Sequence, residues 1–385
     1  MKLFGYKRNN NSVGFRNHFL VVPTVICATR TAQEIVNHVD GAVLLDNQHG
    51  CNHMKQDHEK VFDVLIGMAS NPNVAGVLYI GLGCETIPTK QIAEQAKKTN
   101  KPVECLIIQE EGGTLQTAQK GIRLLEKMIR DIGSFEKTEV DFSDVIVAIE
   151  CGGSDTTSGI ASNPVVGYVA DKIIDLGGTV VFSETTEIIG AEHLLAKRAI
   201  NNEVAQKLLA LVNKCEKSAL AGGEDIRGVN PTPGNIQGGL TTLEEKSLGA
   251  IYKAGTKTIV DVLDYAKPIT EKGLIFMDSP GHDVESVTGM VSGGAQIIIF
   301  TTGRGTPTGC PIAPVIKVCA NPRTYQKMSD NIDFDASTVI EGKETISQAG
   351  ERLFNELVEV INGKKTKTEI LKHHEFAIYL TQPTL

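Results

Sequence analysis

The chain has few of the features that mark membrane, nucleic-acid-binding or disulfide-stabilised proteins. It has no tryptophan and 5% aromatic residues, and no apolar run approaches the ~20 residues of a membrane-spanning helix. Basic residues are scattered and fewer than acidic ones, 38 against 46, whereas a nucleic-acid-binding surface needs clustered Lys and Arg. The N-terminus becomes polar by residues 9–11, so we predict no signal peptide. We expect a cytoplasmic protein that acts on a small molecule and has no nucleic-acid or membrane partner.

Several cofactor and catalytic motifs are absent as well. The eight cysteines include no Cys-x-x-Cys pair, which argues against a structural zinc site and a thioredoxin-like motif. Neither a G-x-x-x-x-G-K-[ST] phosphate loop nor a G-x-S-x-G nucleophile motif occurs. Gly303-Arg-Gly305 lacks the third glycine of a dinucleotide fingerprint, because Thr308 stands there. These absences argue against a nicotinamide-dependent enzyme and a serine hydrolase.

Short β-branched runs alternate with segments of helical periodicity along the whole chain. This pattern predicts an α/β fold with two units of mostly parallel sheet covered by helices, plus a C-terminal helical tail. A polar, aperiodic stretch at residues 133–144 separates an N-terminal α/β domain (1–135) from a C-terminal α/β catalytic domain (143–385). We predict strands at residues 19–22, 41–45, 77–80, 103–108, 145–149, 179–182, 273–277 and 296–300, and helices at 31–39, 55–68, 114–132 and 346–361.

Dense polar clusters follow six of these strands. Ligands of open α/β sheets bind outside the carboxyl ends of the strands, so we expect the active site there. Glycines in the clusters allow sharp turns and close approach of the backbone to a ligand. The clusters are residues 46–51, 81–85, 150–155, 183–187, 278–283 and 301–306.

Three of the clusters carry a cysteine directly after a strand. We predict that Cys51, Cys84 and Cys151 converge on one metal, with His49 or Glu85 as a further ligand. Iron is the natural metal for three thiolates, either as Fe²⁺ alone or as an iron–sulfur cluster with one open corner, and Mn²⁺ is a possible substitute. The alternative is that each cysteine is an inert buried side chain, the commoner state of a single free thiol.

The remaining polar residues suit an elimination reaction. Removing water from a 2,3-dihydroxy acid requires a base for the proton next to the carboxylate, a cation that stabilises the enediolate, and an acid or metal for the departing hydroxyl. Arg304 can clamp a carboxylate with its planar fork, and Arg16 is a second candidate. His193 fits packing equally well. We predict base and acid among His193, Glu184, Asp278 and His282, and substrate contacts from Arg16, Ser154, Asp155, Thr302, Gly303 and Arg304.

At these motifs the chain resembles the altronate dehydratase/galactarate dehydratase family over nearly its whole length. The resemblance implies a lyase that uses ferrous iron or a similar ion to convert a sugar acid such as altronate or galactarate into a 2-keto-3-deoxy acid. It also implies an oligomer with a separate small subunit. The matching segments are Gly5-Tyr-Lys-Arg8, Gly14-Phe-Arg-Asn17, His49-Gly-Cys51, Gly83-Cys-Glu85, Cys151-Gly-Gly-Ser-Asp155, Ser183-Glu184, Gly234-Asn235 and Phe300-Thr-Thr-Gly-Arg-Gly-Thr-Pro307.

Two alternatives for the function stay open. The family includes the large subunit of sulfolactate sulfo-lyase, which releases sulfite and gives pyruvate, and residues 277–286 look closer to that protein or to galactarate dehydratase than to altronate dehydratase. His49-Gly-Cys51-Asn52 departs from the His-x-x-Gly-Cys-Gly form of the sugar-acid members, which leaves substrate and metal geometry open. A non-catalytic sugar-acid-binding protein is the second alternative.

Overall fold

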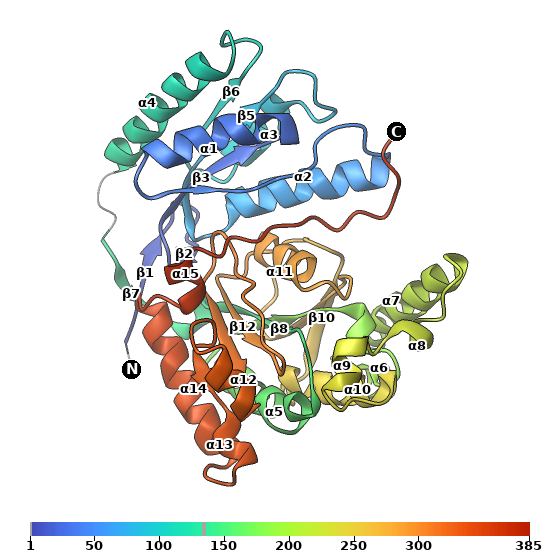
Figure 1. The fold of residues 1–385 in the computed structure, drawn as a ribbon. Coiled ribbons are helices and arrows are strands. Elements are labelled where there is room, and N and C mark those ends of the chain that lie inside the picture. The colour runs from blue at the N-terminus through green and yellow to red at the C-terminus, as the bar shows by residue number, and fades with distance from the viewer. Residues whose placement is uncertain (1, 133–135) are drawn as a thin grey trace.

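The computed structural model describes residues 2–132 and 136–385. They form a seven-stranded and a four-stranded parallel sheet and a three-stranded antiparallel one. Helices cover the two parallel sheets (Figure 1). The predicted α/β class, with two mostly parallel sheets, is therefore confirmed.

The N-terminal sheet has the strand order β4-β3-β5-β6. Helices α1 (Thr29–His38) and α4 (Thr114–Ile132) pack on one face, and α2 (Lys55–Ser70) and α3 (Thr89–Lys97) pack on the other. Because both faces are covered, the strands are apolar along their length, and all eight residues of β5 are buried. The strands are β3 (His18–Pro23), β4 (Ala42–Leu44), β5 (Val74–Gly81) and β6 (Val103–Ile107).

The C-terminal sheet has the order β10-β11-β9-β8-β12-β13-β14, and all its strand pairs are parallel. Helices α5 (Asn163–Asp175) and α14 (Ile346–Ile361) cover one face, and α11 (Asp283–Ser292) packs on the other. The chain continues from β8 to β9 on one side and later places β12 on the other, so β8 stands at a topological switch point, the usual place for a ligand. The strands are β8 (Ile146–Cys151), β9 (Thr179–Phe182), β10 (Ile259–Leu263), β11 (Leu274–Met277), β12 (Ile297–Thr301), β13 (Val315–Cys319) and β14 (Phe334–Asp335).

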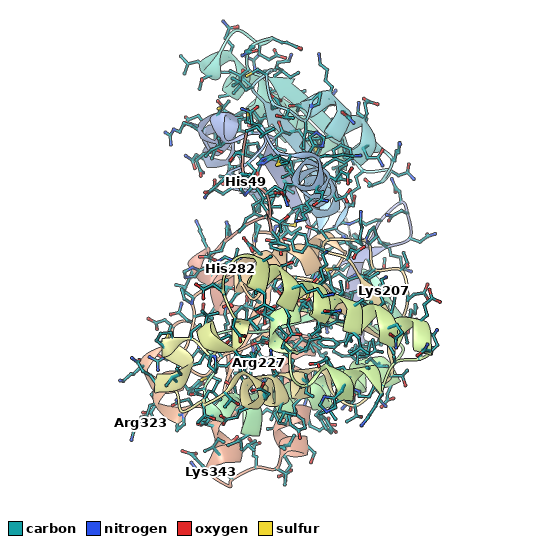
Figure 2. The ribbon with its side chains drawn as sticks, turned by 90° about the vertical axis from the view of Figure 1, so that its right-hand side faces the viewer. His49, Lys207, Arg227, His282, Arg323 and Lys343 are labelled. Carbon is teal, nitrogen blue, oxygen red and sulfur yellow. The ribbon has the colours of Figure 1, made fainter. Side chains whose placement is uncertain are left out.

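Helices α2 and α11 lie between the two parallel sheets and join them through one hydrophobic core (Figure 1). Their C-terminal ends touch, since a Cβ on Gly67 would lie 2.5 Å from the Ser292 carbonyl oxygen. The two helices run alongside each other in Figure 1, so their N-terminal ends lie on one side of the molecule. Each helix follows a strand of its own sheet, so the carboxyl ends of both sheets face that side. His49 and His282, which precede α2 and α11, lie on this shared side in Figure 2.

Further helices fill the long connection between β9 and β10 and the region after β13. The Gly- and Pro-rich passage at residues 222–239 contains two of them. They are α6 (Glu192–Ala196), α7 (Asn202–Ala221), α8 (Ile226–Val229), α9 (Pro233–Gln237), α10 (Leu243–Ala250), α12 (Pro322–Lys327) and α13 (Ser337–Ile340).

The stretch predicted to be an unstructured boundary contains a strand. β7 (Thr138–Val140) pairs with β1 (Leu3–Lys7), which also pairs with β2 (Val13–Gly14). The polar composition fits a short edge strand, whose exposed side chains face water. The predicted end of the N-terminal domain at residue 135 lies outside the described residues.

The chain ends as an extended segment after α15 (Lys367–Leu371). In Figure 1 this red segment runs between the two sheets and finishes beside α2. Asp57 of α2 accepts hydrogen bonds from the backbone N–H groups of Thr381 (2.9 Å) and Gln382 (2.6 Å). The predicted helix at 346–361 is present. The final residues, in contrast, are extended and connect the two sheets. In the described part of the chain, no helix combines the length and apolar character needed to cross a bilayer.

Candidate functional site

Three carboxylates meet at the carboxyl ends of β8 and β9. Glu150 belongs to β8, Glu184 follows β9, and Asp283 begins α11. One oxygen of each lies within 4.8 Å of the others. Among the described residues, no other set of three or more His, Cys, Asp or Glu side chains brings its ligand atoms so close. The site therefore lies at the switch point of the larger sheet.

Strand alternation turns Glu150 toward α11. Ala148, on the same face of β8, belongs to the core that this helix shares. There Ser286 Oγ donates to Glu150 Oε2 at 2.5 Å, and Ser183 Oγ lies 2.5 Å from Ser286 Oγ. The second oxygen of the carboxylate, Glu150 Oε1, is buried and accepts no hydrogen bond from an N–H or hydroxyl group among the described residues, and the neighbouring Glu184 carboxyl lies within hydrogen-bonding reach of Glu150.

Glu184 is held in an uncommon backbone conformation. Its φ of 74° lies in the left-handed region, which costs a non-glycine residue on the order of 1–3 kcal/mol and persists where the surroundings enforce it. Its backbone N–H donates to Ser279 Oγ at 2.9 Å, so the loop after β11 helps to hold it. The turn directs the Glu184 side chain into the cluster.

Two lysines partly balance the carboxylates. Lys253, buried on the turn after α10, lies with Nζ 2.6 Å from Glu187 Oε2 and 3.4 Å from Glu184 Oε2. Lys246 Nζ lies 3.8 Å from Glu187 Oε1. Counting Glu150 and Asp283, four carboxylates face two ammonium groups. The excess negative charge is costly to bury unless protons or a cation neutralise it.

The pKa values separate the carboxylates into two groups. Burial, with Glu150 and Glu187 close by, raises the pKa of Glu184 well above its usual value, and burial raises the pKa of Glu150 to about 7. Burial and Glu187 raise the pKa of Asp283. For Glu187, Lys253 and Lys246 outweigh burial and lower the pKa, while Glu187 and Glu184 outweigh burial and raise the pKa of Lys253. Glu187 and Lys253 therefore form an ion pair, whereas Glu150 and Glu184 keep their protons to a higher pH than exposed carboxyl groups do.

A pocket of about 200 Å³ adjoins the cluster. At about 30 Å³ per water, it has room for roughly seven waters, the size of a small organic acid. Lys246 lines the pocket and pairs with Glu187, and Asn163 lines it with Nδ2 3.8 Å from Cys151 Sγ. The other lining residues are Ser154, Asp155, Thr156, Ser158, Gly159, Ile160, Leu240, Glu245, Gly249 and Ala250.

Of the predicted substrate-binding residues, Ser154 and Asp155 line this pocket. Asp155 is already bonded, because it accepts from Thr157 Oγ1 at 2.6 Å and from Asn321 Nδ2 at 2.8 Å. Thr302 is fully buried and its Oγ1 accepts from the Gly305 N–H. A Cβ on Gly303 would lie 2.2 Å from Asp155 Cγ. These residues form the framework of the loops around the pocket.

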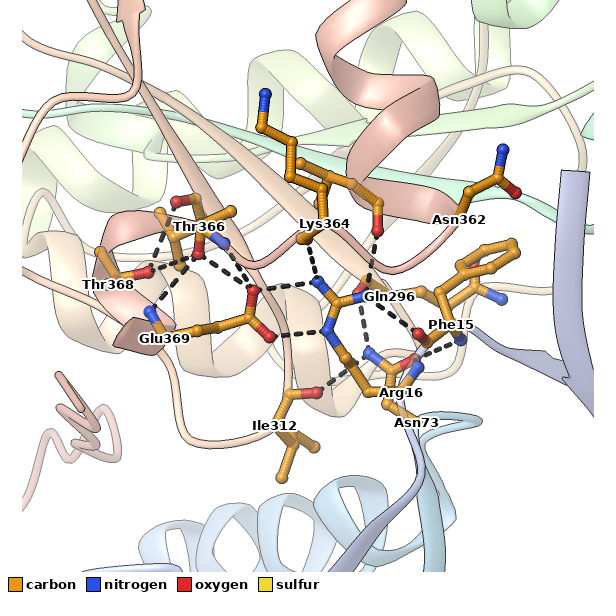
Figure 3. Close-up of polar contacts among 12 residues, drawn as sticks. Phe15, Arg16, Asn73, Gln296, Ile312, Asn362, Lys364, Thr366, Thr368 and Glu369 are labelled. Carbon is orange, nitrogen blue, oxygen red and sulfur yellow. Dashed lines mark hydrogen bonds and ion pairs between the residues drawn. The ribbon is translucent and has the colours of Figure 1, made fainter. Parts of the chain in front are cut away.

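The two predicted carboxylate clamps differ in their surroundings. Arg304 is exposed beside α9, and its guanidinium makes one hydrogen bond, from Nη2 to Gln237 Oε1 at 3.3 Å. Arg16 instead forms two hydrogen bonds with Glu369 and donates to the carbonyl oxygens of Phe15, Val360 and Lys364 (Figure 3). These contacts occupy all five of its N–H groups. Arg16 thus joins the N-terminal segment to the C-terminal helices, and it also lines a pocket of about 260 Å³, so its substrate contact stays a prediction.

The predicted acid and base residues occupy different environments. Only Glu184 belongs to the cluster. His193 is exposed on α6, and Asp278 accepts from Thr185 Oγ1 at 2.5 Å. His282 is exposed at the start of α11, directly before Asp283, with Nδ1 4.0 Å from Glu285 Oε2 (Figure 2).

The predicted metal ligands are divided between the two sheets. Cys151 ends β8 in the larger sheet, where it is buried with Sγ 3.0 Å from Ser154 Oγ, and burial and Glu187 raise its pKa. Cys51 and Cys84 are exposed on loops of the smaller sheet. The predicted convergence of three thiols is not formed, because Cys151 follows a strand of a different sheet.

The two other predicted ligands accompany the exposed thiols. Burial and His53 lower the pKa of His49, whose ring meets His53 edge-on at 5.5 Å between centroids. Glu85 accepts from the Gly83 N–H at 2.6 Å and from Thr89 Oγ1, and these bonds outweigh burial and lower its pKa. Glu85 therefore holds the loop that carries Cys84.

Several residues of the cluster were not among the predicted site residues. Glu150, Glu187 and Asp283 stand in polar clusters that follow strands, so position was a usable signal for them. Ser286 and Lys253 carried no such signal. Lys253 follows Ile251 and Tyr252 on a short turn after α10, and only the tertiary fold buries it beside Glu187.

Replacing Gly152 with alanine should remove Asp283 from the cluster. A Cβ there would lie 2.0 Å from Asp283 Oδ2 and 2.9 Å from the buried Phe300 ring, so the short carboxylate must move. We expect Gly152→Ala to weaken Mn²⁺ binding by about 10- to 100-fold, measured by titration calorimetry. Gly228→Ala, at a position with open space around it, is the control. Equal affinity in both variants would show that Asp283 does not contribute to cation binding.

Comparison with known proteins identifies the family of the chain. The model described as D-galactarate/Altronate dehydratase, C-terminal, matches residues 142–384, and that of the D-galactarate dehydratase/Altronate hydrolase second domain matches residues 5–133. The (2R)-sulfolactate sulfo-lyase subunit beta of Chromohalobacter salexigens is 39% identical over 97% of this chain and 96% of its own length. The altronate dehydratases of Bacillus subtilis and Escherichia coli are 33% and 34% identical over 99% of this chain and 78% of theirs. The chain thus belongs to the D-galactarate/altronate dehydratase family and is an enzyme of the lyase class.

Proposed function

We propose that this chain is the catalytic part of a metal-dependent lyase that removes water from a sugar acid such as altronate or galactarate and yields a 2-keto-3-deoxy acid. The observation that carries the proposal is the buried carboxylate cluster, whose Glu150 Oε1 accepts no hydrogen bond from a described N–H or hydroxyl group, together with a small pocket nearby. The named activities of the altronate dehydratases support the reaction type.

The donor set of the cluster fits a hard or borderline divalent ion such as Fe²⁺ or Mn²⁺. Glu150, Glu184 and Asp283 offer carboxylate oxygens, and once Glu150 and Glu184 release their protons, the two negative charges in excess of Lys246 and Lys253 equal the charge of one divalent ion. When bound, such an ion supplies Lewis acidity that stabilises an enediolate. Its ligands come from β8, the loop after β9 and α11, so the larger sheet and its helix fix their positions.

The surrounding residues would bind and deprotonate the substrate. Lys246 lines the pocket, and Arg304 presents an exposed guanidinium on a neighbouring loop, so both can attract a substrate carboxylate. His282 is the candidate base, because it is exposed and directly precedes the ligand Asp283, and an imidazole exchanges protons near neutral pH. The buried Glu187–Lys253 ion pair holds the side chains beside the carboxylate cluster in place.

Sulfite release is a second candidate function, in which sulfolactate would give pyruvate. The sulfo-lyase subunit beta matches this chain almost from end to end. In both reactions the base removes a proton from the carbon next to the carboxylate, and the leaving group departs from the following carbon. The same ligands and base would therefore serve. We also propose a separate small subunit as partner and an oligomer, and the name "subunit beta" of that relative gives these two proposals partial support. In addition, we propose a cytoplasmic location.

A substrate panel tests the proposal. The anaerobically purified chain, loaded with Fe²⁺ or Mn²⁺ and supplied with the small subunit, would receive altronate, galactarate or (2R)-sulfolactate. A 2-keto-3-deoxy product supports the dehydratase, and sulfite with pyruvate supports the sulfo-lyase. Full turnover after chelation and removal of the metal would contradict metal dependence in either case.

Cation affinity should rise with pH. The pKa of about 7 at Glu150 means that below pH 7 a proton occupies a cation ligand, so cation and proton compete. Because a proton on Glu184 competes as well, we expect the Mn²⁺ association constant to increase by at least about tenfold per pH unit up to about pH 7 and less steeply above it. Calorimetry at about pH 5.5, 6.5 and 7.5, values that bracket this pKa, measures how the association constant changes with pH. A flat profile would show that Glu150 is not a ligand.

Arg304→Lys should raise KM by about tenfold with little change in kcat. A point charge loses one arm of a bidentate contact, and a hydrogen bond to a charged group contributes about 1.5–3 kcal/mol. Steady-state kinetics on the substrate identified by the panel measure the split. Arg323→Lys, on the exposed face of α12, is the matched control. If both variants keep the wild-type KM, Arg304 does not bind substrate.

A further inference from the structure

The exposed cysteines of the chain all lie at one edge of the smaller sheet. Of eight cysteines, only Cys27, Cys51 and Cys84 are exposed. They follow β3, β4 and β5, which are neighbours in the order β4-β3-β5. Free cysteine is among the most buried residue types, so three exposed thiols at the ends of three adjacent strands call for a chemical explanation. Cys27 was not among the predicted ligands.

Hydrogen bonds hold the three thiol-bearing loops together. The N–H of Ile26, next to Cys27, donates to His49 O at 3.0 Å, and the N–H of Thr86 donates to Gly50 O at 3.1 Å. The N–H of Asn52 donates to Thr86 Oγ1 at 2.7 Å. The loop of Cys51 is therefore bonded on one side to the loop of Cys27 and on the other to the loop of Cys84.

Glycine permits this close approach of the loops. Gly50 has φ 115°, and a Cβ there would lie 2.2 Å from the carbonyl oxygen of Thr24. The residue before Cys51 thus touches the backbone that leads to Cys27. A side chain at position 50 would force the two loops apart.

A cluster does not require the three sulfur atoms to lie as close together as a single ion does. One ion would draw its ligand atoms together, but the three thiols do not form a group within 4.8 Å among the described residues. In an iron–sulfur cluster each thiolate binds its own iron, which spreads the protein sulfurs. Thiolates are also the ligands that select such clusters, whereas the carboxylate group of the larger sheet suits a hard ion.

We propose that Cys27, Cys51 and Cys84 ligate an iron–sulfur cluster on the smaller sheet, and that Cys27 takes the place predicted for Cys151. Each thiol releases its proton when it ligates iron, and iron and sulfide come from solution. The fourth corner of the cluster has no thiol from this set. His49, on the loop of Cys51, lies on the same side of the molecule as His282 at the start of α11 (Figure 2). The proposal extends the proposed function, since it adds a second iron site to the lyase.

Reconstitution of the full chain tests the ligand set. The anaerobic protein would be incubated with Fe²⁺, Fe³⁺ and sulfide or with the two iron ions alone, and desalted; the ferric iron supplies the oxidation state of the cluster, so no oxidant is needed. Bound iron, acid-labile sulfide and sulfur-to-iron charge-transfer absorption would then be measured. We expect the wild type and the controls Cys151→Ser and Cys215→Ser to take up sulfide with iron. We expect Cys27→Ser, Cys51→Ser and Cys84→Ser to lose at least about tenfold in cluster content.

Thiol protection gives a second readout that does not require a variant. After reconstitution, alkylation by iodoacetamide should slow at Cys27, Cys51 and Cys84 and stay unchanged at the partly buried Cys215, as read by mass spectrometry. Cluster uptake by Cys27→Ser at the wild-type level, loss of the cluster in Cys151→Ser, or no sulfide uptake by the wild type would each overturn the proposal. A cluster-bearing wild type without turnover on the substrate panel would overturn the proposed lyase activity and leave the ligand assignment intact.

Discussion

Glu184→Gln should lower kcat by about a thousandfold, equivalent to roughly 4 kcal/mol of transition-state stabilisation. The amide keeps the size of the side chain but offers a weaker ligand and no negative charge to the cation. The fold should persist, because Lys253 keeps its closer partner, Glu187, at 2.6 Å. Steady-state kinetics with the panel substrate and thermal unfolding of the same preparation would measure both effects.

A surface carboxylate serves as the control for this variant. Glu216→Gln removes a carboxylate that pairs with Arg227 at 2.6 Å on the rim of the molecule, where ion pairs contribute about 0–1 kcal/mol. Its kcat should equal that of the wild type. Added Mn²⁺ should partly restore Glu184→Gln if the residue is a ligand, because mass action offsets a weaker site. If the kcat of Glu184→Gln stays within about twofold of the wild-type value, Glu184 has no role in the mechanism.

Lys253→Met should destabilise the fold by about 3–5 kcal/mol, because removing one partner of a buried ion pair leaves an uncompensated charge. The Lys253 side chain is 2% exposed and Glu187 is 3% exposed, so water cannot replace the lost ammonium. Equilibrium unfolding in urea measures the change in the free energy of unfolding. Stability should recover partly at low pH, where Glu187 takes up a proton.

Two further variants separate this effect from a general loss of packing. Lys257→Met removes a partly exposed lysine that pairs with Asp175, and it should change the free energy of unfolding by at most about 1 kcal/mol. The double variant Lys253→Met/Glu187→Gln should be more stable than Lys253→Met, because it also removes the buried carboxylate charge that Lys253 neutralises at 2.6 Å. If the double variant is less stable than the single one, the charge is not the cause.

Sequence by itself determined the α/β class and the general location of the site. Alternating apolar runs and helical periodicity are local properties, and buried parallel strands such as β5 must be apolar on both faces. The polar clusters after the strands also predict a site at the carboxyl edge of the sheet, because parallel strands end at a common edge, and the carboxylate cluster lies at such an edge. Glu184 was found for this reason.

Tertiary structure alone decided which polar residues meet. Cys151 and Cys51 both follow a strand, yet the strands belong to different sheets, and no local pattern states how strands are shared between sheets. Arg16 lies in a segment that resembles the family motif, but its partner Glu369 is 353 residues away. Lys253 reaches Glu187 across 66 residues. Such contacts depend on long-range packing, in which burial and charge pairing are settled together, and that information is spread over the whole chain.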